Sequence, residues 1–178
     1  MKLISTIVCT TATMGTSLLL PAVASATDVY CSSDQGIDIT VIDGRAACRA
    51  ASDTSGRARA AGYDGVGYAK ATFGAIAFGI GAAGGVGASE GAGGIPIAIG
   101  IGRDALALTS ISDPGGRGAG APILAVSIAL DGSRAGVEST DNAVVCLGSA
   151  ALAWSSATGA TCLATPFGRW QTAPAAIG

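Results

Sequence analysis

Histidine is absent from the 178 residues, and this absence removes two common chemistries. A Ser-His-acid relay cannot be assembled without the imidazole that accepts the serine proton. Zinc is not expected either, because the cysteines show no C-x-x-C spacing and no histidine can complete a ligand set. We therefore predict no metal site and no cofactor.

Charged residues are scarce, and they make up 12% of the chain with a formal net charge of −2. No basic stripe is present, so the sequence does not favour binding to nucleic acid. Only two glutamates occur, Glu90 and Glu138. Several aspartates lie beside or near glycine or proline, where aspartate is typical of turns: Asp34, Asp43, Asp64, Asp113 and Asp131. No catalytic carboxylate pair is predicted.

The N-terminus has the features of an export signal. Lys2 precedes an apolar stretch, and Ala24-Ser25-Ala26 fits the small-x-small rule for cleavage. We predict a signal peptide over residues 1–26 and a secreted or envelope-associated mature chain. An anchor that is never removed is the alternative.

Cleavage would remove Cys9 and leave four cysteines, Cys31, Cys48, Cys146 and Cys162. An even number in an oxidising compartment indicates two disulfides, for which three pairings exist. We favour Cys31–Cys48 and Cys146–Cys162, because each closes a short local loop near one end of the domain.

Short alternating runs recur along the chain, separated by Gly, Asp-Gly or Asn, and this pattern is typical of many short strands. Ile97-Ala98-Ile99 and Leu124 to Leu130 are two of these runs. The 28 glycines disfavour helices independently. The chain is therefore predicted to be all-β, as a single domain over residues 27–167. We expect a loop insertion at 112–122 and a loose C-terminal tail at 168–178.

Aromatic residues are too few for an ordinary sandwich. The whole chain contains only three Phe, three Tyr and two Trp, whereas sheets about 10 Å apart need bulky residues between them. Small residues repeated in one register suit a thin β-solenoid or β-roll. An irregular β-sandwich or barrel is the alternative.

Two glycine-rich patterns resemble catalytic motifs. Gly87-Ala88-Ser89-Glu90-Gly91 matches the nucleophile elbow G-x-S-x-G, but it lacks a base and a following helix, so we interpret Ser89 as a turn residue. Gly79, Gly81 and Gly84, with Asp104 further on, match a dinucleotide fingerprint. The glycines that follow Gly84 exclude the helix that would hold a pyrophosphate.

The segment 71–102 is almost uncharged, since Glu90 is its only charged side chain. A membrane-active protein that inserts this segment is therefore an alternative hypothesis. Alanine and glycine contribute little transfer energy, however, and buried solenoid strands explain the same composition.

Two resemblances remain. The stretch IPIAIGIGRDALALTS resembles the head repeats of trimeric autotransporter adhesins, which form a β-roll. YDGVGYAKA, LAVSIALDGSR, VVCLG and CLATPFGRW together resemble an uncharacterised family of small secreted actinobacterial proteins. The second resemblance implies export and a domain of unknown function, and it supplies no catalytic or binding residues. We expect a non-enzymatic structural or adhesive protein of the cell envelope, with an unknown surface ligand.

Overall fold

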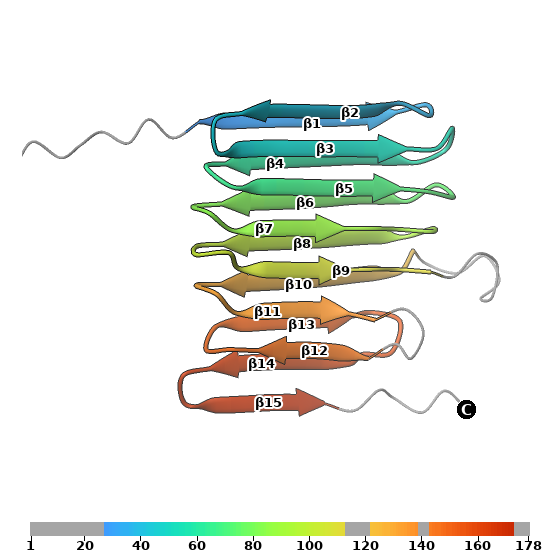
Figure 1. Ribbon diagram of the computed structural model, residues 1–178. Helices are drawn as coiled ribbons and strands as arrows, with labels where there is room; N and C mark the ends of the chain where they lie inside the picture. Colours follow the sequence, from blue (N-terminus) through green and yellow to red (C-terminus); the bar gives the residue numbers. More distant parts are fainter. Residues whose placement is uncertain (1–26, 113–121, 139–142, 173–178) are drawn as a thin grey trace, which may run out of the picture.

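The protein is an all-β solenoid, seen here in a computed structural model that describes residues 27–112, 122–138 and 143–172 (Figure 1). Fifteen strands among the described residues form two sheets that lie against each other. The eight-stranded sheet contains, in spatial order, β1 (Asp28–Asp34), β4 (Arg57–Tyr63), β6 (Ile76–Ala82), β8 (Ile95–Ile101), β10 (Leu124–Leu130), β13 (Ala151–Ser155), β14 (Thr161–Thr165) and β15 (Gly168–Thr172). The seven-stranded sheet contains β12 (Val144–Leu147), β11 (Arg134–Val137), β9 (Leu106–Thr109), β7 (Val86–Ser89), β5 (Val66–Ala71), β3 (Ala46–Ser52) and β2 (Asp38–Asp43).

The central strands are parallel and belong to coils of almost constant length. Arg57 pairs with Ile76 in the eight-stranded sheet, and Val66 pairs with Val86 in the seven-stranded sheet. The coil is longer between Ile97 and Val126, because an extended connection joins β9 to β10. The predicted insertion at 112–122 falls in that connection, and its residues 113–121 lie outside the described residues.

The interior between the sheets is thin, as the scarcity of bulky residues predicts. A Cβ atom on Gly79 would overlap the carbonyl oxygen of Tyr68 in the facing sheet, and one on Gly87 would overlap that of Ile80. Alanines fill most other inward positions, and they include fully buried Ala77, Ala98 and Ala107. The two backbones therefore approach more closely than the roughly 10 Å typical of stacked sheets.

Buried hydroxyls bridge the two sheets directly. The Ser127 hydroxyl in β10 donates to the Leu108 carbonyl oxygen in β9 at 2.9 Å, and the Thr109 hydroxyl donates to the Ile97 carbonyl oxygen at 3.1 Å. Since an unpaired buried hydroxyl is costly, these bonds favour one register of the two sheets.

Both ends of the stack are covered by antiparallel strands. β1 pairs with β4 and β2 with β3 at one end, while β12 pairs with β11 and β13 with β10 at the other. A disulfide joins the two sheets at each end: Cys31–Cys48 connects β1 to β3, and Cys146–Cys162 connects β12 to β14. The predicted local pairing is confirmed. Loops of this size are expected to contribute about 3 kcal/mol each.

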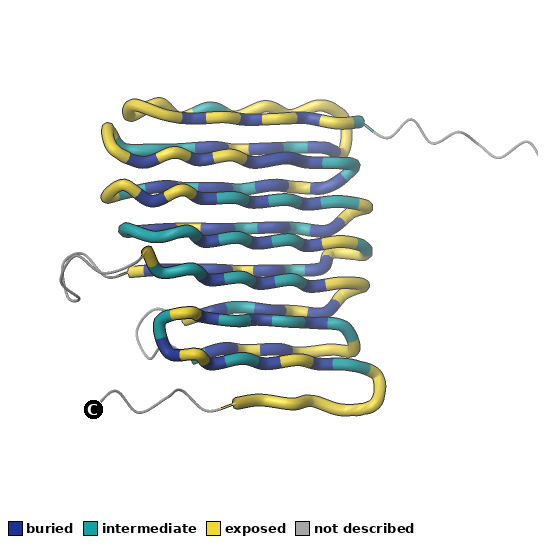
Figure 2. Tube along the Cα trace, turned by 180° about the vertical axis from the view of Figure 1, so that it is seen from behind, coloured by how far each residue is buried: buried dark blue, intermediate teal, exposed yellow. Residues whose placement is uncertain are grey.

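Figure 2 shows the burial that results from this arrangement: buried and more exposed residues alternate along most strands. In the central coils the outward side chains are mostly half-buried, because each lies beside its counterparts in the neighbouring coils. Outward side chains thus form straight columns across the strands, and these columns define the two outer surfaces.

The loose tail predicted over 168–178 is wrong for residues 168–172, which form β15 and pair with β14 through Leu163 opposite Trp170. The segment 71–102 contains β6, β7 and β8. Within the described part of the chain, no helix is long and apolar enough to cross a membrane.

Candidate functional site

The outer surface of the seven-stranded sheet carries a groove of about 680 Å³, which we take as the candidate site. Its floor is one column of outward side chains, in which Tyr68, Ala88, Leu108, Gly136 and Val145 follow one another across β5, β7, β9, β11 and β12. Ala88 and Gly136 are small, so the floor is hollow on both sides of Leu108. The groove therefore runs across the strands, along the axis of the solenoid.

One wall of the groove is polar. This wall contains Glu90, Ser110 and Glu138, which occupy equivalent positions at the ends of successive strands about 4.8 Å apart. Lys70 occupies the equivalent position on β5, next to the end of the groove. Lys70 donates to the Glu90 carboxylate at 2.8 Å, and this hydrogen bond raises the pKa of Lys70. The wall therefore presents the carboxylates of Glu90 and Glu138 to a ligand in the groove, with the Lys70–Glu90 ion pair at its margin.

The opposite wall is mostly apolar and is made by Leu106 and Leu147, with Arg134 between them. A ligand in the groove would contact aliphatic side chains on this wall, an aromatic ring and Leu108 on the floor, and carboxylates and a guanidinium at the margins.

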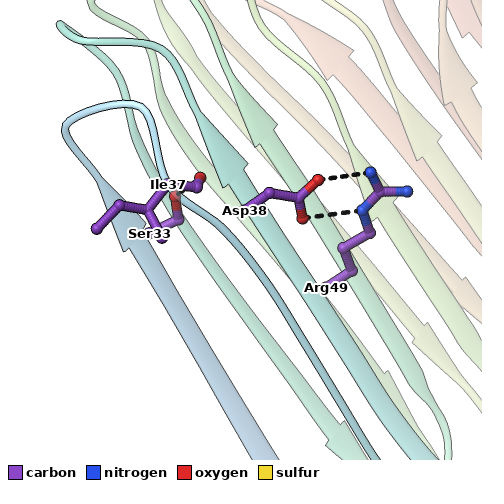
Figure 3. A network of polar contacts seen from close by, with 4 residues as sticks. All are labelled: Ser33, Ile37, Asp38 and Arg49. Atoms are coloured by element: carbon purple, nitrogen blue, oxygen red, sulfur yellow. Dashed lines mark hydrogen bonds and ion pairs between the residues drawn. The ribbon is translucent and has the colours of Figure 1, made fainter.

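An ion pair lies on the same outer surface, in the coil next to Tyr68. Arg49 lies beside Tyr68 in the same column, and its guanidinium donates two hydrogen bonds to the carboxylate of Asp38, at 3.1 and 2.6 Å (Figure 3). The hydrogen bond from Arg49 lowers the pKa of Asp38. Near the end of β1 the hydroxyl of Ser33 donates to the carbonyl oxygen of Ile37, the residue that precedes β2 (Figure 3).

Ser89 is not a turn residue, contrary to the interpretation of the elbow motif. It is the last residue of β7, it is 1% exposed, and its hydroxyl donates to the Pro96 carbonyl oxygen at 2.9 Å. Lys70 lies on the outer surface, where it pairs with Glu90, whereas Ser89 points inward. A buried hydroxyl of this kind is a structural bridge between the sheets.

The glycines of the pattern that resembles a dinucleotide-binding fingerprint also have structural roles. Gly79 and Gly81 in β6 lie against the backbone of β5, and Gly84 is in a turn with a left-handed φ of +78°. Asp104, in the same turn position one coil later, has a φ of 65°. In the described residues, no group of three or more cysteine or acidic side chains is placed to hold a metal ion.

The sequence alone does not reveal the groove. In the sequence, Tyr68 and Lys70 belong to one alternating run, and the two glutamates are notable only because glutamate is rare in this chain. The signal that could have found the groove is the equal spacing of Lys70, Glu90 and Ser110 along the chain, which places them in one column once a coil length is assumed.

Comparison with known proteins gives one match. The profile of a family of unknown function, DUF6764, matches residues 1–165. No curated protein and no solved structure matches the chain, so the resemblance to adhesin head repeats remains a prediction.

Proposed function

We propose that this chain, which belongs to the DUF6764 family of unknown function, is an exported binding protein of the cell envelope. Its binding site is the groove on the seven-stranded sheet. The observation that carries the proposal is the regular column of Tyr68, Leu108 and small residues beside a wall that holds the carboxylates of Glu90 and Glu138.

The ligand class that fits this groove best is an extended glycan chain. Sugar rings present apolar C–H faces, which suit an aromatic ring and a leucine floor, and hydroxyl edges, which suit carboxylates and a guanidinium. The groove also continues over several coils, so it matches a linear polymer better than a compact small molecule.

We propose binding without catalysis. A glycosidase needs a general acid that an apolar environment keeps protonated. Glu90 and Glu138 are the only glutamates of the chain and both line the groove, yet both are exposed, and Glu90 is paired with Lys70. Neither therefore has the desolvated environment that an acid catalyst requires.

Export is part of the same proposal. It is supported by the signal-like residues 1–26 and by two disulfides, which are compatible with an oxidising environment. Cell fractionation followed by N-terminal sequencing should find the protein outside the cytoplasm, beginning at Thr27. An intact N-terminus in the cytoplasmic fraction would contradict export.

The binding site is tested by co-sedimentation of the purified protein with isolated peptidoglycan sacculi. We expect Tyr68→Ala to weaken binding about tenfold, because it removes the aromatic floor. Ala88→Leu should weaken it by filling the hollow between Tyr68 and Leu108. Phe167→Ala is the matched control, since Phe167 is 93% exposed and lies outside the groove.

Equal binding by all three variants would place the site elsewhere, and absence of binding by the parent protein would contradict the ligand class. Release of soluble fragments from the sacculi, lost on changing Glu138 to Gln, would overturn the non-enzymatic part of the proposal.

A further inference from the structure

The outer surface of the eight-stranded sheet is a flat apolar face of a different character from the groove. Each of β6, β8 and β10 points four side chains outward, and all twelve are apolar: Ile76, Phe78, Ile80 and Ala82; Ile95, Ile97, Ile99 and Ile101; Leu124, Val126, Ile128 and Leu130. Monomeric proteins rarely expose a continuous apolar face of this extent.

The residues of this face are arranged almost symmetrically about its centre. The column through Ile99 reads Tyr30, Ala61, Ile80, Ile99, Ile128, Leu152, Leu163 and Trp170 from β1 to β15. Aromatic residues stand at both ends and isoleucines at the centre. The neighbouring column reads Ser32, Arg59, Phe78, Ile97, Val126, Trp154, Thr161 and Thr172, with polar residues at both ends.

We infer that this face is the interface with a second copy of the same chain. The two-fold axis runs parallel to the strands, between β8 and β10. Rotation about this axis places each column of one copy opposite the same column of the other copy and reverses the order of the strands. As a result, β8 faces β10, β6 faces β13 and β4 faces β14 of the other copy.

This pairing matches protruding side chains with hollows. Leu163 is 39% exposed, and the axis brings it opposite Ala61. Ala61 lies in a hollow of about 260 Å³ that Tyr30, Arg59 and Phe78 help to line.

The aromatic residues are matched in the same way. Trp154 comes opposite Phe78 and Trp170 opposite Tyr30. Aromatic pairs of this kind gain energy beyond the area that they bury.

Charge selects the orientation of the axis. With the axis parallel to the strands, Arg57 and Arg59 of β4 face β14, whose outward residues are Thr161, Leu163 and Thr165. A two-fold axis along the stack would instead lay β4 on β4 of the other copy, in the reverse direction, and bring the two Arg59 side chains close together at the interface. Like charges in a desolvated interface are strongly unfavourable.

The area is sufficient for a stable dimer. Eight strands about 4.8 Å apart and roughly 20 Å long give about 770 Å² per copy, which is close to the ~800 Å² per partner of a standard specific interface. The groove on the seven-stranded sheet remains free in this dimer, because it lies on the opposite surface.

The inference is tested by sedimentation velocity of the purified protein over a dilution series. We expect a dimer, and we expect Ile99→Lys to raise the dissociation constant at least ~100-fold because it buries an unpaired charge at the axis. Leu108→Lys is the matched control, since Leu108 lies on the groove surface and its substitution should leave the dimer intact. Circular dichroism checks that each variant keeps its fold.

A mixing experiment tests the orientation itself. The axis places Ile99 opposite Ile128 of the other copy. Ile99→Lys and Ile128→Glu chains should each be monomeric alone and should form a heterodimer when mixed, with one Lys–Glu pair and one Ile–Ile pair. A monomeric parent protein, a dimeric Ile99→Lys variant or failure of the mixture to associate would each overturn the inference, whatever the outcome of the glycan assay.

Discussion

Glycine and alanine set the distance between the two sheets. The two sheets pack closely because several inward glycines lie against carbonyl groups of the facing strand, and Gly79 against Tyr68 is an example. At this position the backbone conformation is ordinary, so glycine is required by the close approach and not by a left-handed φ. The small side chains thus determine the architecture at the scale of one residue.

The close contact at Gly79 predicts that adding a single methyl group there will strongly reduce the stability of the fold. Gly79→Ala should destabilise the fold by about 3 kcal/mol, because the overlapping atoms belong to backbone that cannot move aside. Gly136→Ala is the control: its Cβ would lie 3.1 Å from the Leu108 carbonyl oxygen on the outer surface, and it should stay within ~1 kcal/mol of the parent. Urea unfolding measures both. A similar midpoint for the two variants would contradict the thin interior.

At the scale of the element, the sequence predicts strands well where bulky and small residues alternate. Ile97-Ala98-Ile99 and Leu124 to Leu130 are confirmed as parts of β8 and β10. It misses β7 and β11, where Gly87 and Ala135 on the interior face are followed by equally small Ala88 and Gly136 on the groove floor. The alternation vanishes there because two different constraints both demand small residues.

The groove could not be predicted for a related reason. Its residues come from strands of successive coils, so the site depends on a coil length that single-strand patterns do not contain. The short local disulfides, in contrast, depend on spacing alone, and their pairing was predictable.

One turn carries a charge that links successive coils. Asp53, between β3 and β4, accepts hydrogen bonds from the backbone N–H groups of Ser55 at 2.9 Å and Gly56 at 2.6 Å. Its second oxygen accepts from the N–H of Phe73, in the turn one coil later, at 2.6 Å. These bonds, led by that from Phe73, lower the pKa of Asp53 to about 2.

The shift predicts a pH dependence of stability. Because the folded-state pKa lies below the usual value of 3.8, the stabilisation is present above about pH 4 and is lost as the pH falls through about 2. Asp53→Ala should therefore lower the melting temperature at pH 7, and the difference from the parent should disappear near pH 2. Differential scanning calorimetry at several pH values measures it. A difference that stays constant with pH would show that the carboxylate charge is not its source.

At the scale of the whole molecule, the two outer surfaces are suited to two roles. The groove combines apolar and charged groups, whereas the face of β6, β8 and β10 is uncharged. A dimer formed through the latter presents two grooves that point in opposite directions. Such an arrangement would connect two separate glycan chains, one on each side of the dimer, if the proposed binding function is correct.

The coil repeat also makes the molecule modular. In a solenoid each coil contacts only its neighbours, so removing one whole coil should preserve the rest. Asp104 lies directly over Gly84, and its backbone N–H donates to the Gly84 carbonyl oxygen at 2.9 Å, which shows that the two positions are equivalent. Deletion of residues 85–104 removes β7 and β8 together and places β9 beside β5 and β10 beside β6 with their columns unchanged.

We expect the protein without residues 85–104 to fold, with a β-type circular dichroism spectrum and a single, lower melting transition. Deletion of residues 85–94 is the control, because it removes β7 alone. It would move β8 into the seven-stranded sheet and turn Ile95, Ile97 and Ile99 toward an interior that accepts only small residues. The shorter deletion should therefore abolish folding although it removes less of the chain, and equal stability of the two proteins would contradict the repeat.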